Sequence, residues 1–256
     1  MEWIEHSGIA LGIFPVLESI APELKVFFTS RLGGVSKPPD DSLNLGEGLG
    51  DRTGDVRKNR RLILNALGIS VRNVARAEQV HGAKVGIVKR GGVRGGLDGL
   101  VTAARSLTLV ISTADCYPVI IYSPSEKVLM ALHVGRSGAA HRIIERGLDI
   151  LAARYRIDIE HSIALIGPGI CNRCYTVSER SALGFHEKFR RLRDGRWHLD
   201  LLSFCVTELK RGGLKTRNIY GSGECTSCQP DLFFSHRRDR GRTGRHWTLA
   251  AISPFP

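Results

Sequence analysis

The chain has 256 residues, of which 42% are hydrophobic and 24% charged, a composition typical of a globular protein with a sizeable core. No apolar run approaches the roughly 18 residues of a membrane span, so the sequence predicts no membrane-spanning helix and no membrane partner. The formal net charge of +12 suits an anionic partner such as phosphate, a nucleotide or a nucleic acid. The N-terminal residues lack the pattern of a signal peptide, and we expect a cytoplasmic protein.

Runs rich in Val, Ile and aromatic residues predict strands, and apolar residues recurring every three or four positions predict helices. In chain order these patterns predict a strand at 25–31, a helix at 55–67, strands at 84–90, 107–113, 118–123 and 128–134, a helix at 138–155, a strand at 162–167, helices at 180–192 and 200–211, and a strand at 217–223. Hairpins beside helices indicate an α+β fold with mixed or antiparallel sheets. Because no linker or internal repeat interrupts the chain, we expect one domain over residues 1–256.

Three side chains that can bind a metal lie at or near the ends of predicted strands. They are His81 in "EQVHGAKV", Cys116 in "STADCYPV" and His133 in "MALHVGRSG". Two imidazoles and a thiolate form a three-ligand zinc site, and catalytic zinc sites leave a fourth position for water or substrate. Their separation along the chain matches no compact zinc-binding loop, so the spacing alone also allows three packed side chains.

Asp115, directly before Cys116, has two interpretations. Its carboxylate could orient a metal ligand or move protons near the metal, or it could accept backbone N–H bonds in the turn. The sequence leaves both open.

The six cysteines are too few for a scaffold stapled by disulfides. Four of them form two Cys-x-x-Cys pairs, Cys171 with Cys174 and Cys225 with Cys228. The spacing within each pair is that of a structural zinc site, but the gap between the pairs is long for a zinc ribbon. A second metal site and a set of reduced thiols both remain open, and Cys205 is interpreted as a small core residue.

Many short pieces, in order, resemble the YfiH family, which carries the label of laccase-domain polyphenol oxidase and has been assigned to purine nucleoside metabolism. The matching pieces are "FFTSRLGGVS" (27–36), "SLNLG" (42–46), "QVHG" (79–82), "DGLVT" (98–102), "ADCYPV" (114–119), "LHVG" (132–135), "IGPGI" (166–170), "CYTV" (174–177) and "CTSCQPDLFFSHRRDRGRTGR" (225–245). The resemblance implies two sheets packed between helical layers (an αββα arrangement), with the metal held by His81, Cys116 and His133.

The activity implied by the resemblance is zinc-dependent purine nucleoside phosphorolysis of adenosine, inosine, guanosine and methylthioadenosine, together with adenosine deamination. Purine nucleosides and phosphate are then the expected partners. Arg31 and Asn44 match the N-terminal family motifs, so they are candidates for phosphate, ribose or other substrate contacts, or they fix their Gly-rich loops. Gln79, near His81, is a further substrate-side candidate. No glutamate shows the pairing seen in known zinc deaminases, and the general acid and base stay unassigned.

One departure from the family falls beside the third ligand. The family reads His, a small residue and Gly-Trp-Arg-Gly, whereas this chain reads "HVGRSG", with Arg136 at the tryptophan position and Ser137 at the arginine position. Arg136 is therefore a candidate to reach substrate in place of that arginine.

Other functions remain as alternatives. A multicopper laccase needs many histidines, commonly in His-x-His pairs, and nine histidines without such a pair argue against it, although His and Cys ligands also suit a single copper ion. Cys116 as a nucleophile with a histidine base would make a cysteine hydrolase, and editing of peptidoglycan precursors would also be hydrolytic. A nucleic-acid-binding module is disfavoured, because the arginine clusters lack interleaved aromatic residues.

Overall fold

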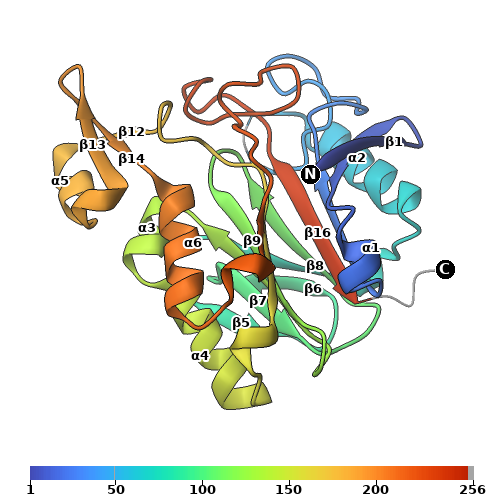
Figure 1. Ribbon diagram of the computed structural model, residues 1–256. Coiled ribbons are helices and arrows are strands. Elements are labelled where there is room, and N and C mark those ends of the chain that lie inside the picture. Colours follow the sequence, from blue (N-terminus) through green and yellow to red (C-terminus); the bar gives the residue numbers. More distant parts are fainter. Residues whose placement is uncertain (49, 253–256) are drawn as a thin grey trace.

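The strands at the centre of the molecule have no polar face. β9 (Tyr117–Ser123) and β10 (Val128–Val134) are buried along their whole length. Strands covered on both faces read as continuous apolar runs instead of alternating patterns, which is what these two segments show. In the computed structural model, which describes residues 1–48 and 50–252, one face of their sheet is covered by a second sheet and the other by helices (Figure 1).

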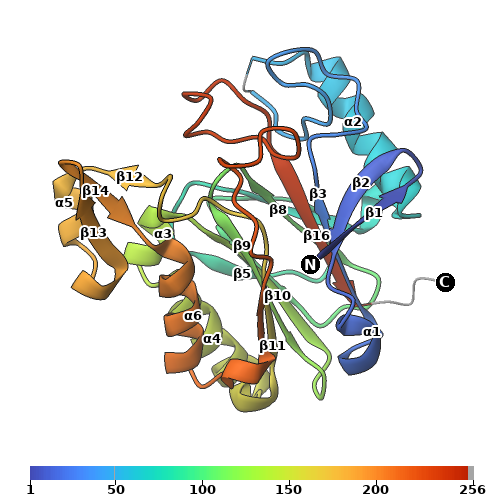
Figure 2. The ribbon, with the colours of Figure 1, turned by 45° about the horizontal axis from the view of Figure 1, so that its top comes forward.

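The strands form two large mixed sheets and one small sheet. The seven-stranded sheet has the order β1 (Glu2–His6), β2 (Ile9–Ile13), β3 (Leu24–Thr29), β16 (His246–Ile252), β8 (Thr108–Thr113), β4 (Val74–Glu78) and β6 (Gly92–Gly95). The six-stranded sheet has the order β15 (Ile219–Gly221), β11 (Ile163–Ile166), β9, β10, β7 (Gly99–Thr102) and β5 (Val85–Ile87). The third sheet, of β12 (Thr176–Val177), β14 (Arg196–Leu199) and β13 (Arg190–Arg193), projects to one side of the molecule with α5 (Glu179–Leu183) (Figure 2).

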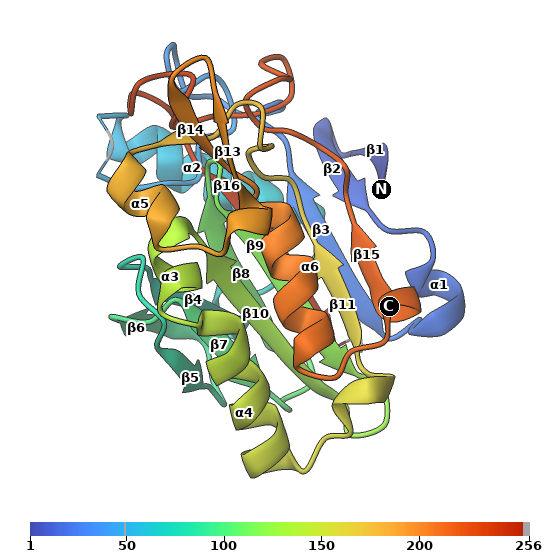
Figure 3. The same ribbon diagram turned by 60° about the vertical axis from the view of Figure 1, so that its left-hand side comes forward.

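Helices cover the outer faces of both large sheets. α3 (Arg136–Ala140), α4 (Ile143–Tyr155) and α6 (Leu201–Arg211) lie over the six-stranded sheet (Figure 3). α2 (Thr53–Ala66) covers the seven-stranded sheet. The remaining helical segments are α1 (Leu17–Ile20) and the short 3-10 turns η1 (Val71–Asn73), η2 (Ile159–His161), η3 (Glu187–Phe189) and η4 (Thr216–Asn218). Within the described parts of the chain, no helix is both long and apolar enough to cross a bilayer.

Three apolar clusters fill the spaces between these layers. Phe28, Leu109 and Ile120 belong to the cluster between the two sheets. A second cluster lies between the six-stranded sheet and α3, α4 and α6, and a third packs α2 against the seven-stranded sheet around Trp247. The predicted α+β class, with two sheets between helical layers, is confirmed.

Two predicted helices are wrong in part. The helix predicted over 138–155 is two helices, because Arg142 adopts a left-handed φ of 64° that interrupts the backbone ladder between α3 and α4. α3 is held against the loop after His81, where a Cβ on Gly138 would lie 2.7 Å from the carbonyl oxygen of Gly82. Its direction is thus set by a contact distant in sequence, which the continuous apolar stripe could not reveal.

The helix predicted over 180–192 ends at Leu183, and residues 190–193 form β13 instead. β13 pairs with β14, so that Leu192 lies opposite Trp197. This cross-strand pairing overrides the local helical pattern.

Candidate metal centre

His81, Cys116 and His133 come together at one end of the two sheets. Their potential ligand atoms all lie within 4.8 Å of one another. His81 follows β4 in a left-handed conformation, with a φ of 57°, and Cys116 lies in the connection between β8 and β9. The rings of His81 and His133 meet edge to face, with centroids 4.8 Å apart.

Strand pairing and a glycine explain why the sulfur reaches the histidines. β9 and β10 form a hairpin in which His133 lies opposite Pro118, next to the Cys116 connection. A Cβ on Gly135 would lie 2.8 Å from the sulfur of Cys116. Because no real Cβ tolerates such a contact, glycine is required at position 135 for the thiol to occupy this place.

Asp98, the residue before β7, holds both histidines and is fully buried. Its carboxylate accepts hydrogen bonds from Nδ1 of His133 at 2.8 Å and from the backbone N–H groups of His81 at 2.9 Å and Gly82 at 2.6 Å. A carboxylate that only accepts holds a proton of His133 on Nδ1, so Nε2 is the ring nitrogen available to a metal once its own proton is lost. The sequence analysis quoted the "DGLVT" motif but did not assign Asp98 a role.

The charges of the cluster favour a thiolate. Burial alone would raise the pKa of Cys116, but the charge and hydrogen bonds of His133 and His81 lower it to about 6. Burial alone would lower the pKa of His133, whereas the Cys116 thiolate and the hydrogen bond to Asp98 raise it to about 9. A metal ion that displaces the proton from Nε2 of His133 would meet a sulfur already charged for coordination.

The residues fit a metal ion with three protein ligands. Tetrahedral zinc places nitrogen and sulfur ligands about 3.3–3.8 Å apart, so only small movements are needed from the present separations. His133 is buried, Cys116 is half-buried and His81 is exposed, which leaves one side of the cluster open to solvent. The donor set of two imidazoles and a thiolate suits zinc, and also copper.

Neither methionine of the chain supplies the axial thioether that often completes a copper site with two histidines and a cysteine. Met130 packs against Gly147 on the helical side of its sheet, and Met1 lies against Gly12. A copper site of that type would therefore lack its thioether ligand here.

Asp115 does not point at the metal ligands but ties the C-terminal part of the chain to the site. Oδ1 accepts hydrogen bonds from the hydroxyls of Thr226 and Ser235, each at 2.7 Å, and Oδ2 accepts one from the backbone N–H of Arg237 at 2.6 Å. Its φ of 89° is unusual for a residue other than glycine. Asp115 thus accepts a backbone N–H bond, but from Arg237, which is distant in the chain, and not within its own turn as the sequence analysis considered.

Arg31 and Asn44 make their contacts within the N-terminal and C-terminal loops. Arg31 donates to the backbone oxygens of Asp41 at 2.7 Å and Pro230 at 2.9 Å. The side-chain oxygen of Asn44, fully buried, accepts from the backbone N–H of Arg245 at 2.9 Å. Both side chains thus fix these loops to each other.

Gln79 forms a two-point contact with β8. Its amide donates to the carbonyl oxygen of Ser112 and accepts from the N–H of the same residue, both at 2.7 Å. This contact anchors the segment that carries His81.

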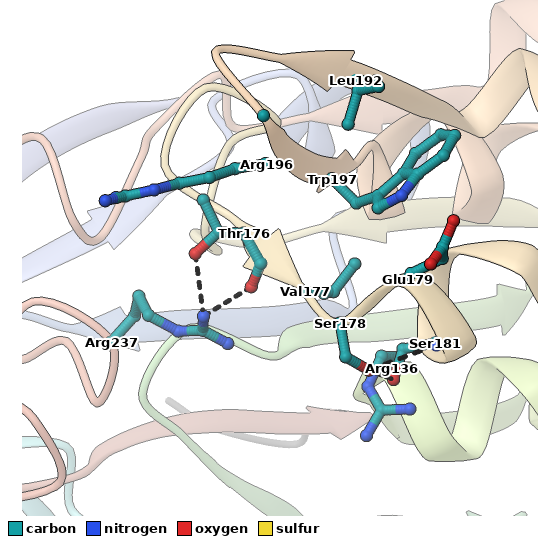
Figure 4. A pocket seen from close by; sticks show the side chains of 11 residues that line it. Arg136, Thr176, Val177, Ser178, Glu179, Ser181, Leu192, Arg196, Trp197 and Arg237 are labelled. Carbon is teal, nitrogen blue, oxygen red and sulfur yellow. Dashed lines mark hydrogen bonds between the residues drawn. The ribbon is translucent and has the colours of Figure 1, made fainter.

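An open cavity of about 820 Å³ is lined in part by Arg136, which lies three residues after His133 in the chain (Figure 4). Its lining includes Arg136, Arg196 and Arg237, together with Trp197. Arg136 directly follows Gly135, so the cavity begins one residue from the glycine that contacts Cys116. The structure thereby joins Arg136 to Arg196 and Arg237, which come from other elements and which the sequence analysis did not place together at one site.

Tyr175 precedes Thr176 of the cavity lining and is close enough to Cys116 to be affected by its charge. The guanidinium of Arg237 sits over its ring, 5.2 Å from the centroid. Burial raises the pKa of Tyr175 to about 12, and the nearby charge of Cys116 acts in the same direction. Its phenol therefore stays protonated beside the thiolate.

Comparison with known proteins places this geometry in a family. A family model described as multi-copper polyphenol oxidoreductase laccase matches residues 25–253. The crystal structure of the hypothetical protein YfiH of Bacillus licheniformis superposes with a TM-score of 0.90 at 28% identity and covers 98% of this chain and 99% of that one. The chain belongs to the YfiH family.

Other proteins similar to this YfiH-family chain carry a more specific name. A purine nucleoside phosphorylase of Deinococcus radiodurans is 38% identical over 91% of both chains. The purine nucleoside phosphorylase YlmD of Geobacillus stearothermophilus is 35% identical over 85% of this chain and 86% of that one. The crystal structure of YlmD from the same organism has a TM-score of 0.90 and covers 97% of both chains.

Proposed function

We propose that this chain is a zinc-dependent purine nucleoside phosphorylase that also deaminates adenosine. The observation that carries the proposal is that Arg136, in a cavity lined by three arginines, lies three residues after His133 of the His81, Cys116 and His133 cluster, which could hold a metal ion. It is supported by the 38% identity to a protein named purine nucleoside phosphorylase. Adenosine, inosine, guanosine and methylthioadenosine are the proposed substrates.

The arginine-lined cavity supports phosphorolysis. Arg136, Arg196 and Arg237 would bind phosphate, since guanidinium groups match its oxygens in geometry and charge. An oriented phosphate oxygen would form a bond to the ribose C1′ as the bond from C1′ to the purine breaks, and the purine would leave with a proton. Trp197 offers the flat apolar surface on which a base can stack.

The metal site, on which we propose that both activities depend, supports the deamination directly. Zinc, when bound, supplies a Lewis acid that activates water for attack on the amino-bearing carbon of adenine. His81, Cys116 and His133 would hold the ion, and Asp98 keeps the Nδ1 proton of His133 in place. Asp115 would position Arg237 through its backbone N–H.

In this proposal, Arg31, Asn44 and Gln79 hold the segments around the site in place. Arg31 and Asn44 would keep the loops around the site in position, with any substrate contact made from the same place. Gln79 would hold the His81 segment against β8.

The test is turnover of adenosine and inosine by protein of measured metal content, with and without phosphate, the products being separated by chromatography. We expect phosphate-dependent release of free base by the wild type. His81→Ala and Cys116→Ser should lose zinc and lower the rate by about 100-fold or more. Arg237→Ala should keep zinc but raise the KM for phosphate by about 10-fold or more, because a charge-assisted hydrogen bond is lost.

Two control variants match the ligand variants in residue type. His161→Ala changes an exposed histidine on η2, and Cys205→Ala changes a buried cysteine on α6, so both should keep the wild-type rate and metal content. No turnover of either nucleoside by zinc-loaded wild type would refute the proposal and make peptidoglycan-precursor hydrolysis the next assay. Activity that survives removal of the metal but not Cys116→Ser would instead indicate a cysteine hydrolase.

A further inference from the structure

The fold brings the two Cys-x-x-Cys pairs into one cluster, which has no part in the proposed nucleoside chemistry. The potential ligand atoms of Cys171, Cys174, Cys225 and Cys228 all lie within 4.8 Å of one another. The sulfur of Cys228 is 3.4 Å from that of Cys174 and 4.0 Å from that of Cys171. From these positions we propose that the chain holds a second, structural zinc ion, bound by these four thiolates.

The sulfur separations match a tetrahedral ion. With zinc–sulfur bonds of about 2.3 Å, the sulfurs of a four-cysteine site stand about 3.8 Å apart, a value between the two separations of Cys228 from its neighbours. A disulfide would require about 2.05 Å, and all four thiols are free. Since all four ligands come from the protein, the site is closed to substrate, as structural zinc sites are.

The backbone around the cysteines is shaped to hold them together. Cys171 and Cys174 begin and end a tight turn, in which the N–H groups of Cys174 and Tyr175 both donate to the carbonyl oxygen of Cys171 at 3.0 Å. The N–H of Cys171 donates to the sulfur of Cys225 at 3.3 Å. Such a hydrogen bond would orient and stabilise a thiolate that binds a metal.

A parallel bridge aligns the two turns. Gly169 pairs with Cys225, and the N–H of Thr226 donates to the carbonyl oxygen of Gly169 at 3.1 Å. This contact explains how pairs so distant in sequence form one cluster. The long gap between them is closed by the fold and not by a zinc-ribbon loop.

The cluster lies where it can stabilise the walls of the cavity. Thr226, next to Cys225, donates its hydroxyl to Asp115. Thr176, two residues beyond Cys174, accepts through its backbone and side-chain oxygens from the guanidinium of Arg237 (Figure 4). An ion across the two turns would therefore fix both segments that hold Asp115 and Arg237.

The test counts zinc and does not depend on the proposed activity. Wild-type protein purified without chelators should carry two zinc ions per chain, by native mass spectrometry and elemental analysis. Cys174→Ser/Cys228→Ser should lose one ion and unfold at a lower temperature, while Cys205→Ala keeps both. His81→Ala should lose the other ion and keep the one at the four cysteines.

Alkylation of the wild type provides a measurement that does not need a folded variant. The four cysteines should resist iodoacetamide until a chelator removes the zinc, and peptide mapping would identify them. At most one zinc ion per chain, lost in His81→Ala, would overturn the proposal. Iron in the cluster, a Cys174–Cys228 disulfide, or rapid alkylation of all four thiols would overturn it equally.

Discussion

At the scale of single residues, the candidate metal site depends on a carboxylate outside the three proposed ligands. Asp98 joins two ligands on different elements, because it accepts from the ring of His133 and from the backbone of His81. Burial would raise the pKa of Asp98, but the hydrogen bond from His133 and those from the backbone lower it. The carboxylate is thus ionised, and both of its oxygens accept hydrogen bonds.

Asp98→Asn should weaken zinc binding by about 10- to 100-fold, the range typical for residues that orient a ligand. The amide of asparagine would point a donor at N–H groups that now meet an acceptor, which would disturb the His81 loop as well as the His133 ring. Competition with a chelator measures the zinc affinity. Asp231→Asn, at an exposed aspartate, is the control, and equal zinc affinity in both variants would contradict the role of Asp98.

At the scale of elements, one ion pair joins the ends of the two large sheets. Glu23, just before β3, accepts a hydrogen bond from the hydroxyl of Tyr122 on β9 at 2.6 Å and pairs with Lys127, just before β10. Burial would raise the pKa of Glu23, but the hydrogen bonds from Lys127 and Tyr122 lower it to about 2.

This pKa predicts how the pair contributes to stability as the pH changes. Because the folded pKa of Glu23 lies below its unfolded value of 4.5, the stabilisation is fully present above about pH 4.5 and is lost as the pH falls toward about 2. Partial exposure of both side chains limits it to about 1 kcal/mol. In urea unfolding, the difference in unfolding free energy between the wild type and Glu23→Gln should become smaller as the pH falls. A difference that stays constant with pH would contradict the contribution of the Glu23 pair. Glu18→Gln on α1 is the control and should leave the unfolding free energy at the wild-type value.

The predicted strands agree with the structure where burial alone determines the sequence pattern. The apolar runs of β8, β9, β10 and β11 lie within a residue or two of their predicted bounds, since strands inside a sandwich need nothing but apolar side chains. β16, although buried along its whole length, was not predicted, because its histidine, tryptophan and threonine interrupt the apolar run. Short strands such as β6 and β12 depend on their partners more than on their own residues.

At the scale of the whole molecule, several of the arginines hold loops in place. Arg60 stacks on Trp247, 5.1 Å from the ring centroid, and pairs with Glu47. Arg238 pairs with Asp239 and donates to the carbonyl oxygens of Thr226 and Phe233. The arginine clusters at 58–61 and 236–246, which contain Arg60 and Arg238, thus include structural residues. A nucleic-acid surface gains no support from them.

At the candidate site, some residues could be predicted from the sequence and others only from the fold. Family motifs indicated His81, Cys116 and His133, and the structure brings these side chains together. Arg196 and Arg237 could not be joined to Arg136 from the sequence, because the cavity is assembled from α3, the small sheet and a C-terminal loop. Its composition is a consequence of tertiary structure.

Asp115 is the point at which that C-terminal loop is attached to the core. Its two oxygens accept three hydrogen bonds, from Thr226, Ser235 and the backbone of Arg237. An asparagine side chain at this position would keep the backbone conformation, since asparagine tolerates positive φ, but it would have one acceptor oxygen and would turn a donor toward another donor. Asp115→Asn should therefore cost about 2–3 kcal/mol of unfolding free energy.

The same substitution should distinguish an effect on the C-terminal loop from an effect on the metal ligands. If Asp115 positions Arg237, the KM for phosphate should rise in Asp115→Asn while the zinc content at His81, Cys116 and His133 stays at the wild-type level. Asp194→Asn is the matched control for stability, because Asp194 also has a positive φ, of 47°, but lies exposed in the turn between β13 and β14. Loss of zinc with an unchanged KM would show that Asp115 acts on the metal ligands, which is the interpretation that its hydrogen bonds disfavour.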